Sequence, residues 1–227
     1  MTPRTEPVQP ISEGIVAARV HGRYLVVPPA AAGPAPILVG FHGYAEGAEE
    51  QMERLRAIPE SSRWLCVSIQ GLNRFYQRRS NQVVASWMTR QNRELAIADN
   101  IAWVTSCIDA IAAEYATLPK LIFAGFSQGV GMAFRAAAHA TRPVAGVIAV
   151  GGDIPPEITP TALTKVSAAL IARGTSDEFY RKQKFVDDER RLRDSSVDVR
   201  ALEFSGGHEW SGEVVEAAGQ FLRERAR

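Results

Sequence analysis

The chain of 227 residues is long enough to bury a continuous core, and 46% hydrophobic with 22% charged residues is the composition of a folded globular protein. Its 26 basic and 25 acidic residues leave a net charge of +1, which gives no bulk electrostatic reason to expect nucleic acid as a partner. No stretch of about 18 apolar residues and no signal-like N-terminal segment occurs, so we expect no stable membrane insertion and a cytoplasmic location.

The N-terminal part predicts a mobile tail, residues 1–13, followed by a single domain, residues 14–227. Residues 14–20 and 23–27 predict two short strands joined by a tight turn at His21-Gly22.

Extended and helical patterns then alternate. The expected strands are 37–41, 64–69, 121–124, 144–150, 168–172 and 197–204. The expected helices are 49–58, 92–115, 129–140, 179–194 and 213–225. Residues 71–89 show no clean period and predict a long loop. This alternation predicts an α/β fold, a mostly parallel central sheet with helices on both faces, whose catalytic groups gather at the carboxyl ends of the strands.

The strongest local signal is Gly125-Phe126-Ser127-Gln128-Gly129, which lies between an apolar strand and an alanine-rich helix. A G-x-S-x-G turn in this context is typical of a nucleophile elbow, where the two glycines leave room for neighbouring backbone and the serine hydroxyl is presented to solvent. Alone, the pentapeptide is equally compatible with a simple glycine-rich turn.

A serine hydroxyl needs a base to act as a nucleophile near neutral pH. Of the four histidines, only His208 lies between the last strand and the terminal helix, in Gly206-Gly207-His208-Glu209-Trp210. Because it comes third in the chain order serine, acid, histidine, we expect His208 to be the base. We expect His42, which follows an earlier strand, to have a structural role.

A buried carboxylate must orient the histidine. Asp177 follows the strand 168–172 in the required order and is our preferred acid, with Asp153 and Glu178 as competitors. For the oxyanion hole, the backbone N–H of Gln128 is one expected donor. The loop Gly40-Phe41-His42-Gly43-Tyr44 is placed to supply the other, and we choose the N–H of Tyr44.

With these four motifs in order, the sequence resembles the phospholipase/carboxylesterase family of α/β-hydrolases, which includes acyl-protein thioesterases and small bacterial carboxylesterases. The matching residues include Phe41 to Tyr44 with Glu46, the elbow, Gly174 to Asp177, and Gly207-His208. The resemblance implies hydrolysis of a small-molecule carboxylic ester or thioester through an acyl-enzyme on Ser127, without a metal or an organic cofactor.

Two departures from the family pattern affect this expectation. Ala45 stands where the family commonly has a second glycine in the oxyanion loop. Glu209-Trp210 after the histidine looks more like the small bacterial esterases than the acyl-protein thioesterases. Protein deacylation is therefore the weaker interpretation.

Fewer than about twenty residues separate the strands 144–150 and 168–172, so we expect no cap domain and an open site. The loop 71–89 would then form its main wall. Its large side chains are candidate substrate contacts or packing residues: Phe75, Tyr76, Trp87 and Met88. Nearby arginines could attract an anionic substrate or form a solvated surface: Arg74, Arg78, Arg79, Arg90 and Arg93.

Two other functions remain open at this point. One is a receptor-like member that binds a small ligand without appreciable turnover. Another is an amidase or acyltransferase that uses the same nucleophile. We expect a monomer or a homodimer.

Overall fold

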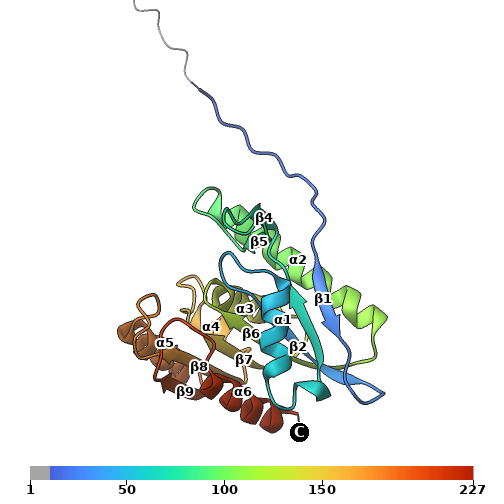
Figure 1. The fold of residues 1–227 in the computed structure, drawn as a ribbon, viewed down its shortest axis with the longest axis vertical. Coiled ribbons are helices and arrows are strands. Elements are labelled where there is room, and N and C mark those ends of the chain that lie inside the picture. Colours follow the sequence, from blue (N-terminus) through green and yellow to red (C-terminus); the bar gives the residue numbers. More distant parts are fainter. Residues whose placement is uncertain (1–10, 227) are drawn as a thin grey trace, which may run out of the picture.

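The central sheet is formed by seven strands in the order β1-β3-β2-β6-β7-β8-β9, in a computed structural model that describes residues 11–226 (Figure 1). The strands are β1 (Tyr24–Val27), β2 (Ala35–Phe41), β3 (Leu65–Ile69), β6 (Thr117–Phe126), β7 (Val144–Val150), β8 (Ala168–Gly174) and β9 (Asp198–Phe204). Only β1 runs antiparallel to its neighbour β3. The predicted mostly parallel sheet is therefore confirmed.

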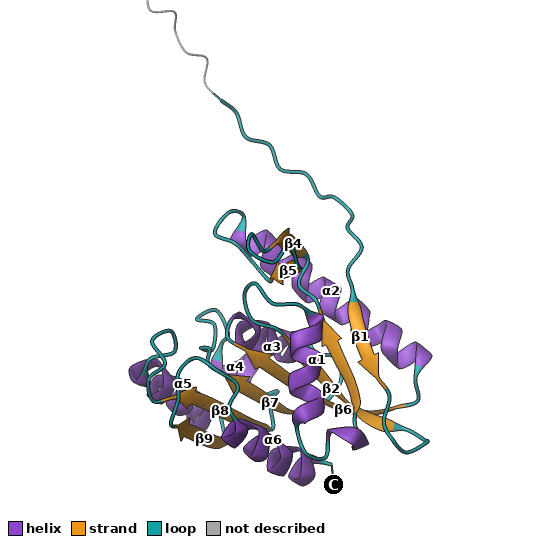
Figure 2. Cartoon of the chain, viewed as in Figure 1, coloured by secondary structure: helices purple, strands orange, loops and turns teal. Residues whose placement is uncertain are grey.

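Helices cover both faces of this sheet (Figure 2). They are α1 (Ala48–Ala57), α2 (Arg93–Glu114), α3 (Gln128–His139), α4 (Pro160–Leu163), α5 (Lys182–Asp194) and α6 (Gly212–Arg225), with a short 3-10 turn at Ser61–Arg63. Because side chains alternate along a strand, Val39 points into one core layer with α2, α3 and α5, and Leu38 points into the other with α1 and α6. The α/β-hydrolase fold class predicted from the sequence is confirmed.

The predicted strand at residues 14–20 is wrong. These residues are exposed and have no strand partner, while β1 pairs with β3 instead of with them. An extended, partly apolar sequence is not sufficient for a strand when no neighbouring edge accepts its hydrogen bonds. Of the tail predicted at residues 1–13, residues 1–10 lie outside the described part of the chain.

The predicted loop 71–89 contains a β-hairpin instead, formed by β4 (Asn73–Tyr76) and β5 (Val83–Ser86). β5 is buried on both faces, through Val84 and Ser86 on one face and Ala85 on the other. Each strand has only four residues, so neither shows a clear period in the sequence.

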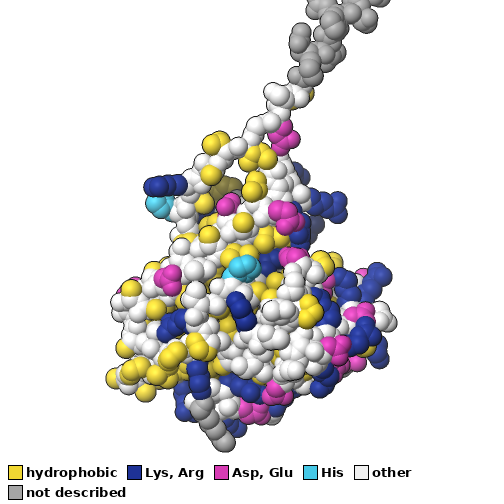
Figure 3. All heavy atoms as spheres, turned by 180° about the vertical axis from the view of Figure 1, so that it is seen from behind, with side chains coloured by type: hydrophobic (Ala, Val, Ile, Leu, Met, Phe, Trp, Pro, Cys, Tyr) yellow, Lys and Arg dark blue, Asp and Glu magenta, His cyan; other side chains and the backbone are white. Residues whose placement is uncertain are grey.

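Residues 151–167, between β7 and β8, contain only the short helix α4, so they leave no room for a cap domain. Seen from behind, the molecule carries basic and acidic side chains interspersed over its surface, in keeping with the near-zero net charge (Figure 3).

By length and composition alone, α2 could cross a membrane, and among residues 11–226 it is the one helix that passes this test. Its apolar side chains Val104, Cys107 and Ile111 are nevertheless buried against the sheet and α3. A core helix of a globular protein has this pattern, so the observation is weak evidence for a membrane span.

Candidate active site

Ser127 lies on the sharp turn between β6 and α3. Its backbone has φ 53° and ψ −119°, a conformation that a residue with a side chain rarely adopts. A Cβ atom on Gly125 would lie 2.4 Å from the carbonyl oxygen of Gly129, and one on Gly129 would lie 2.1 Å from that of Phe41. Only glycine fits at these positions, and the strained turn presents the hydroxyl at the carboxyl end of the sheet.

Ser127, His208 and Asp177 come together from three separate loops. His208 Nε2 lies 2.8 Å from Ser127 Oγ, and His208 Nδ1 lies 2.9 Å from Asp177 Oδ2. The Asp177 carboxylate can only accept a hydrogen bond, so the imidazole proton belongs on Nδ1, and Nε2 is left with a lone pair facing the serine hydroxyl. This is the arrangement that a general base needs.

Asp177 is held by its own turn. Its side chain is 1% exposed, and Oδ1 accepts hydrogen bonds from the backbone N–H groups of Phe179 at 2.8 Å and Tyr180 at 2.9 Å. With Oδ1 occupied in this way, Oδ2 is directed to His208. The carboxylate therefore fixes both the position and the tautomer of the imidazole.

The competing residues lie elsewhere. Asp153 forms an ion pair with Lys184, and Glu178 is exposed. His139 Nδ1 lies 2.9 Å from the carbonyl oxygen of Arg135. His42 is fully buried, and its two ring nitrogens are engaged by the Gly71 N–H and the Gly43 carbonyl oxygen, so neither is free to act on the serine.

The backbone N–H groups of Tyr44 and Gln128, our expected oxyanion donors, donate to no protein acceptor within the described part of the chain. Unpaired amides next to a nucleophile are what an oxyanion hole requires. The side chain of Gln128 is fixed against the exit of β5, since its Oε1 accepts from the Trp87 N–H at 2.9 Å and its Nε2 donates to the Met88 carbonyl at 3.2 Å.

Glu46 and Arg54 form a paired unit under the oxyanion loop that the sequence reasoning only half anticipated. Glu46 matches the family motif, but its partner Arg54 lies one helix away, on α1, and no local pattern links the two. Arg54 donates to both carboxylate oxygens of Glu46, each at 2.6 Å.

The four candidate substrate contacts differ in how far their side chains are exposed. Trp87 is only 1% exposed, and its indole N–H donates to the His42 carbonyl at 2.9 Å, so its side chain packs the core and is not available to a substrate. Tyr76 is 70% exposed. Phe75 and Met88 are half-buried, with the Phe75 ring 5.7 Å from that of Tyr44.

Phe179 is a candidate contact that the sequence reasoning missed. Its side chain is 78% exposed although its ring centroid lies 4.9 Å from that of His208. The sequence did contain a signal for this contact, because Phe179 lies two positions after the predicted acid. The turn that holds Asp177 also places Phe179 next to the histidine. For metals, the described residues contain no group of three or more histidine, cysteine or acidic side chains able to hold an ion.

A family model described as Phospholipase/Carboxylesterase matches residues 26–225. A search of curated protein sequences gives no significant match.

Solved structures of several esterases have the same fold. The Bacillus cereus carboxylesterase is 15% identical with a TM-score of 0.72, covering 90% of this chain and 94% of that one. Esterase PE8 is 21% identical with a TM-score of 0.66, covering 90% and 99%. Zea mays acyl-protein thioesterase 2 is 18% identical with a TM-score of 0.67, covering 91% and 100%. With its family match extending over most of the sequence, the chain belongs to the phospholipase/carboxylesterase family of α/β-hydrolases.

Proposed function

We propose that the protein is a serine hydrolase that cleaves carboxylic esters or thioesters through an acyl-enzyme on Ser127. Membership of the family supports an esterase-type hydrolase. The single observation that carries the finer proposal is the hydrogen-bonded chain from Ser127 Oγ through His208 to the buried Asp177.

In the proposed reaction, His208 Nε2 accepts the proton of Ser127 as Oγ attacks the carbonyl carbon. The negative charge that forms on the carbonyl oxygen is stabilised by the N–H groups of Tyr44 and Gln128. Protonated His208 then gives its proton to the leaving alcohol or thiol. Water, deprotonated by His208, attacks the acyl-enzyme and releases the acid and free Ser127.

The proposed substrates are small molecules, with short acyl chains as the preferred class. The exposed aromatic side chains Tyr44 and Phe179 lie on residues next to the hole and the base, where they could contact either side of an ester. The proposal also includes a monomer or homodimer acting in the cytoplasm.

A panel of p-nitrophenyl esters from acetate to palmitate tests this proposal. We expect turnover by the parent and a loss of roughly a thousandfold or more in Ser127→Ala, Asp177→Ala and His208→Ala. Ser106→Ala, at an exposed serine on α2, is the matched control and should keep parental activity. A parent inert towards esters and thioesters would favour a ligand-binding function instead, and products formed with added alcohol acceptors would reveal acyl transfer.

A further inference from the structure

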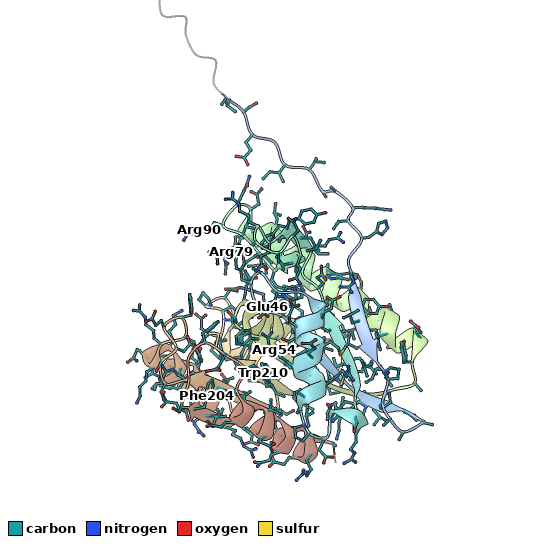
Figure 4. The ribbon with its side chains drawn as sticks, in the orientation of Figure 1. Glu46, Arg54, Arg79, Arg90, Phe204 and Trp210 are labelled. Carbon is teal, nitrogen blue, oxygen red and sulfur yellow. The ribbon has the colours of Figure 1, made fainter. Side chains whose placement is uncertain are left out.

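Glu46 connects the oxyanion loop to α1. Its Oε2 accepts a hydrogen bond from the Gly43 backbone N–H at 2.7 Å, and Gly43 directly precedes Tyr44, the proposed oxyanion donor. Arg54 binds the same carboxylate through two hydrogen bonds of 2.6 Å. Figure 4 shows Glu46, Arg54 and Trp210 one above another beside α1.

The pair is shielded from water, since the side chains of Arg54 and Glu46 are only 19% and 21% exposed. Burial alone would raise the pKa of Glu46, but the hydrogen bonds and positive charge of Arg54, with the Gly43 N–H, outweigh burial and hold the pKa below its ordinary value. Glu46 is therefore an anion at neutral pH.

Arg54 also contacts the nucleophile elbow. Its guanidinium carbon lies 4.3 Å from the ring centroid of Phe126, the residue before Ser127. Phe126 is 6% exposed, and its ring lies 5.0 Å from that of His208. One side chain thus joins the loop that supplies Tyr44 to the turn that supplies Ser127 and Gln128.

A carboxylate in this place presents an electrostatic conflict. It orients the Gly43 peptide, yet its negative charge lies close to the site where the reaction creates a second negative charge. In a partly buried environment such repulsion is poorly screened. Bidentate pairing with a guanidinium removes most of the net charge while leaving the hydrogen bond to Gly43 intact.

Building on the proposed function, we propose that Arg54 is a positioning residue that neutralises Glu46, so that Glu46 can orient the oxyanion loop without opposing the oxyanion. The role acts on the transition state, where the charge develops, and not on the uncharged ester. Arg54 acts through its ion pair with Glu46, and this role requires no contact between Arg54 and the substrate.

The first test is Arg54→Met with p-nitrophenyl butyrate. We expect kcat to fall roughly 10- to 100-fold while KM changes less than about twofold, because only the charged transition state is affected. Affinity for phenylboronic acid, which forms an anionic tetrahedral adduct on the serine, should fall by a similar factor. Arg56→Met, an exposed position on the same helix with the same change in charge, is the matched control and should behave as the parent.

The double variant Glu46→Gln with Arg54→Met distinguishes two causes of a lower kcat, the negative charge of unpaired Glu46 and a loss of order in the oxyanion loop. Glutamine can still accept from Gly43 but carries no charge, so we expect kcat to recover to within about fivefold of the parent. In the single variant, burial would raise the pKa of the unpaired Glu46, so the ratio of parental to variant kcat should shrink as pH falls. Arg54→Lys, which keeps the charge, should retain most activity.

Unchanged kcat in Arg54→Met, or a double variant as slow as Arg54→Met, overturns the inference while leaving Ser127 chemistry in place. Circular dichroism and thermal unfolding of each variant identify any that fails to fold. If Arg54→Met fails to fold, Arg54→Lys tests the inference, because a folded lysine variant with low kcat contradicts neutralisation by charge. Absence of any Ser127-dependent turnover in the parent would instead overturn the proposed function, and this inference with it.

Discussion

His42 is a fully buried histidine with both ring nitrogens engaged. Nε2 accepts from the Gly71 N–H at 3.0 Å, so the ring proton belongs on Nδ1, which lies 2.6 Å from the Gly43 carbonyl oxygen. The ring also stacks on Trp87, with centroids 5.0 Å apart. A neutral imidazole thereby joins the oxyanion loop to Gly71, two residues after the end of β3, which is a structural role.

We predict that His42 makes stability depend on pH. Burial lowers the pKa of His42 from its ordinary value of 6.5. The unfolded chain therefore binds the proton more readily, and stability is lost as pH falls below about 6.5 towards the lower pKa of the folded state. Urea unfolding at pH 7.5 and 5.5 should show a smaller loss for His42→Gln than for the parent. Equal losses in the two proteins would contradict this assignment.

The sequence predicted which residues could form the triad because each follows a strand, and parallel strands bring their carboxyl ends to one edge. The roles of Ser127, Asp177 and His208 could be predicted without knowing how the helices pack. The role of Arg54 could not, because its contact with Glu46 depends on how α1 lies against the oxyanion loop. The burial of Trp87 was equally hidden, since an aromatic residue in an irregular segment can face either the solvent or the core.

At the level of elements, the β4–β5 hairpin supports both parts of the proposed oxyanion hole. Ala85 exchanges backbone hydrogen bonds with the oxyanion loop, donating to the Glu46 carbonyl at 2.8 Å and accepting from the Ala45 N–H at 3.1 Å. Beyond β5, the Trp87 N–H and the Met88 carbonyl bind the side chain of Gln128. The hairpin therefore connects the loop of Tyr44 to the turn of Gln128.

Gln128→Ala tests this connection. The variant keeps the backbone N–H but loses the side-chain bonds to the hairpin, so we expect kcat to fall about tenfold with a smaller change in KM, because the donor is less well oriented. Gln82→Ala, at an exposed glutamine next to β5, is the control. Steady-state kinetics with a soluble short-chain ester measures both values. Full parental kcat in Gln128→Ala would show that the hairpin does not orient the elbow.

At the level of the whole molecule, alternation of apolar strands and amphipathic helices was enough to predict the layers of the fold, because each element has to bury one face or both. The N-terminal strand and the hairpin were mispredicted because the sequence pattern does not determine pairing at the edge of a sheet. Pairing at a sheet edge depends on which partner is available, and four-residue strands carry too little pattern to show it.

The core assignment of α2 predicts a large cost for truncating its buried face. Ile111 is 0% exposed between α2 and the sheet, so Ile111→Ala should lower the free energy of unfolding by about 2–4 kcal/mol. Leu95→Ala, at a side chain 48% exposed on the same helix, should change it by less than about 1 kcal/mol. Urea denaturation of both variants measures the difference, and similar values would contradict the packing of α2 described above.

Covalent labelling tests the central claim, that Ser127 is a nucleophile activated by His208, most directly. The protein would be incubated with a fluorophosphonate, followed by intact mass measurement and peptide mapping, with Ser127→Ala and His208→Ala alongside. We predict one adduct per chain on the peptide that contains Ser127, no adduct in Ser127→Ala, and labelling slowed by roughly a thousandfold in His208→Ala. An unlabelled parent, or a label on another residue that persists in Ser127→Ala, would contradict the account.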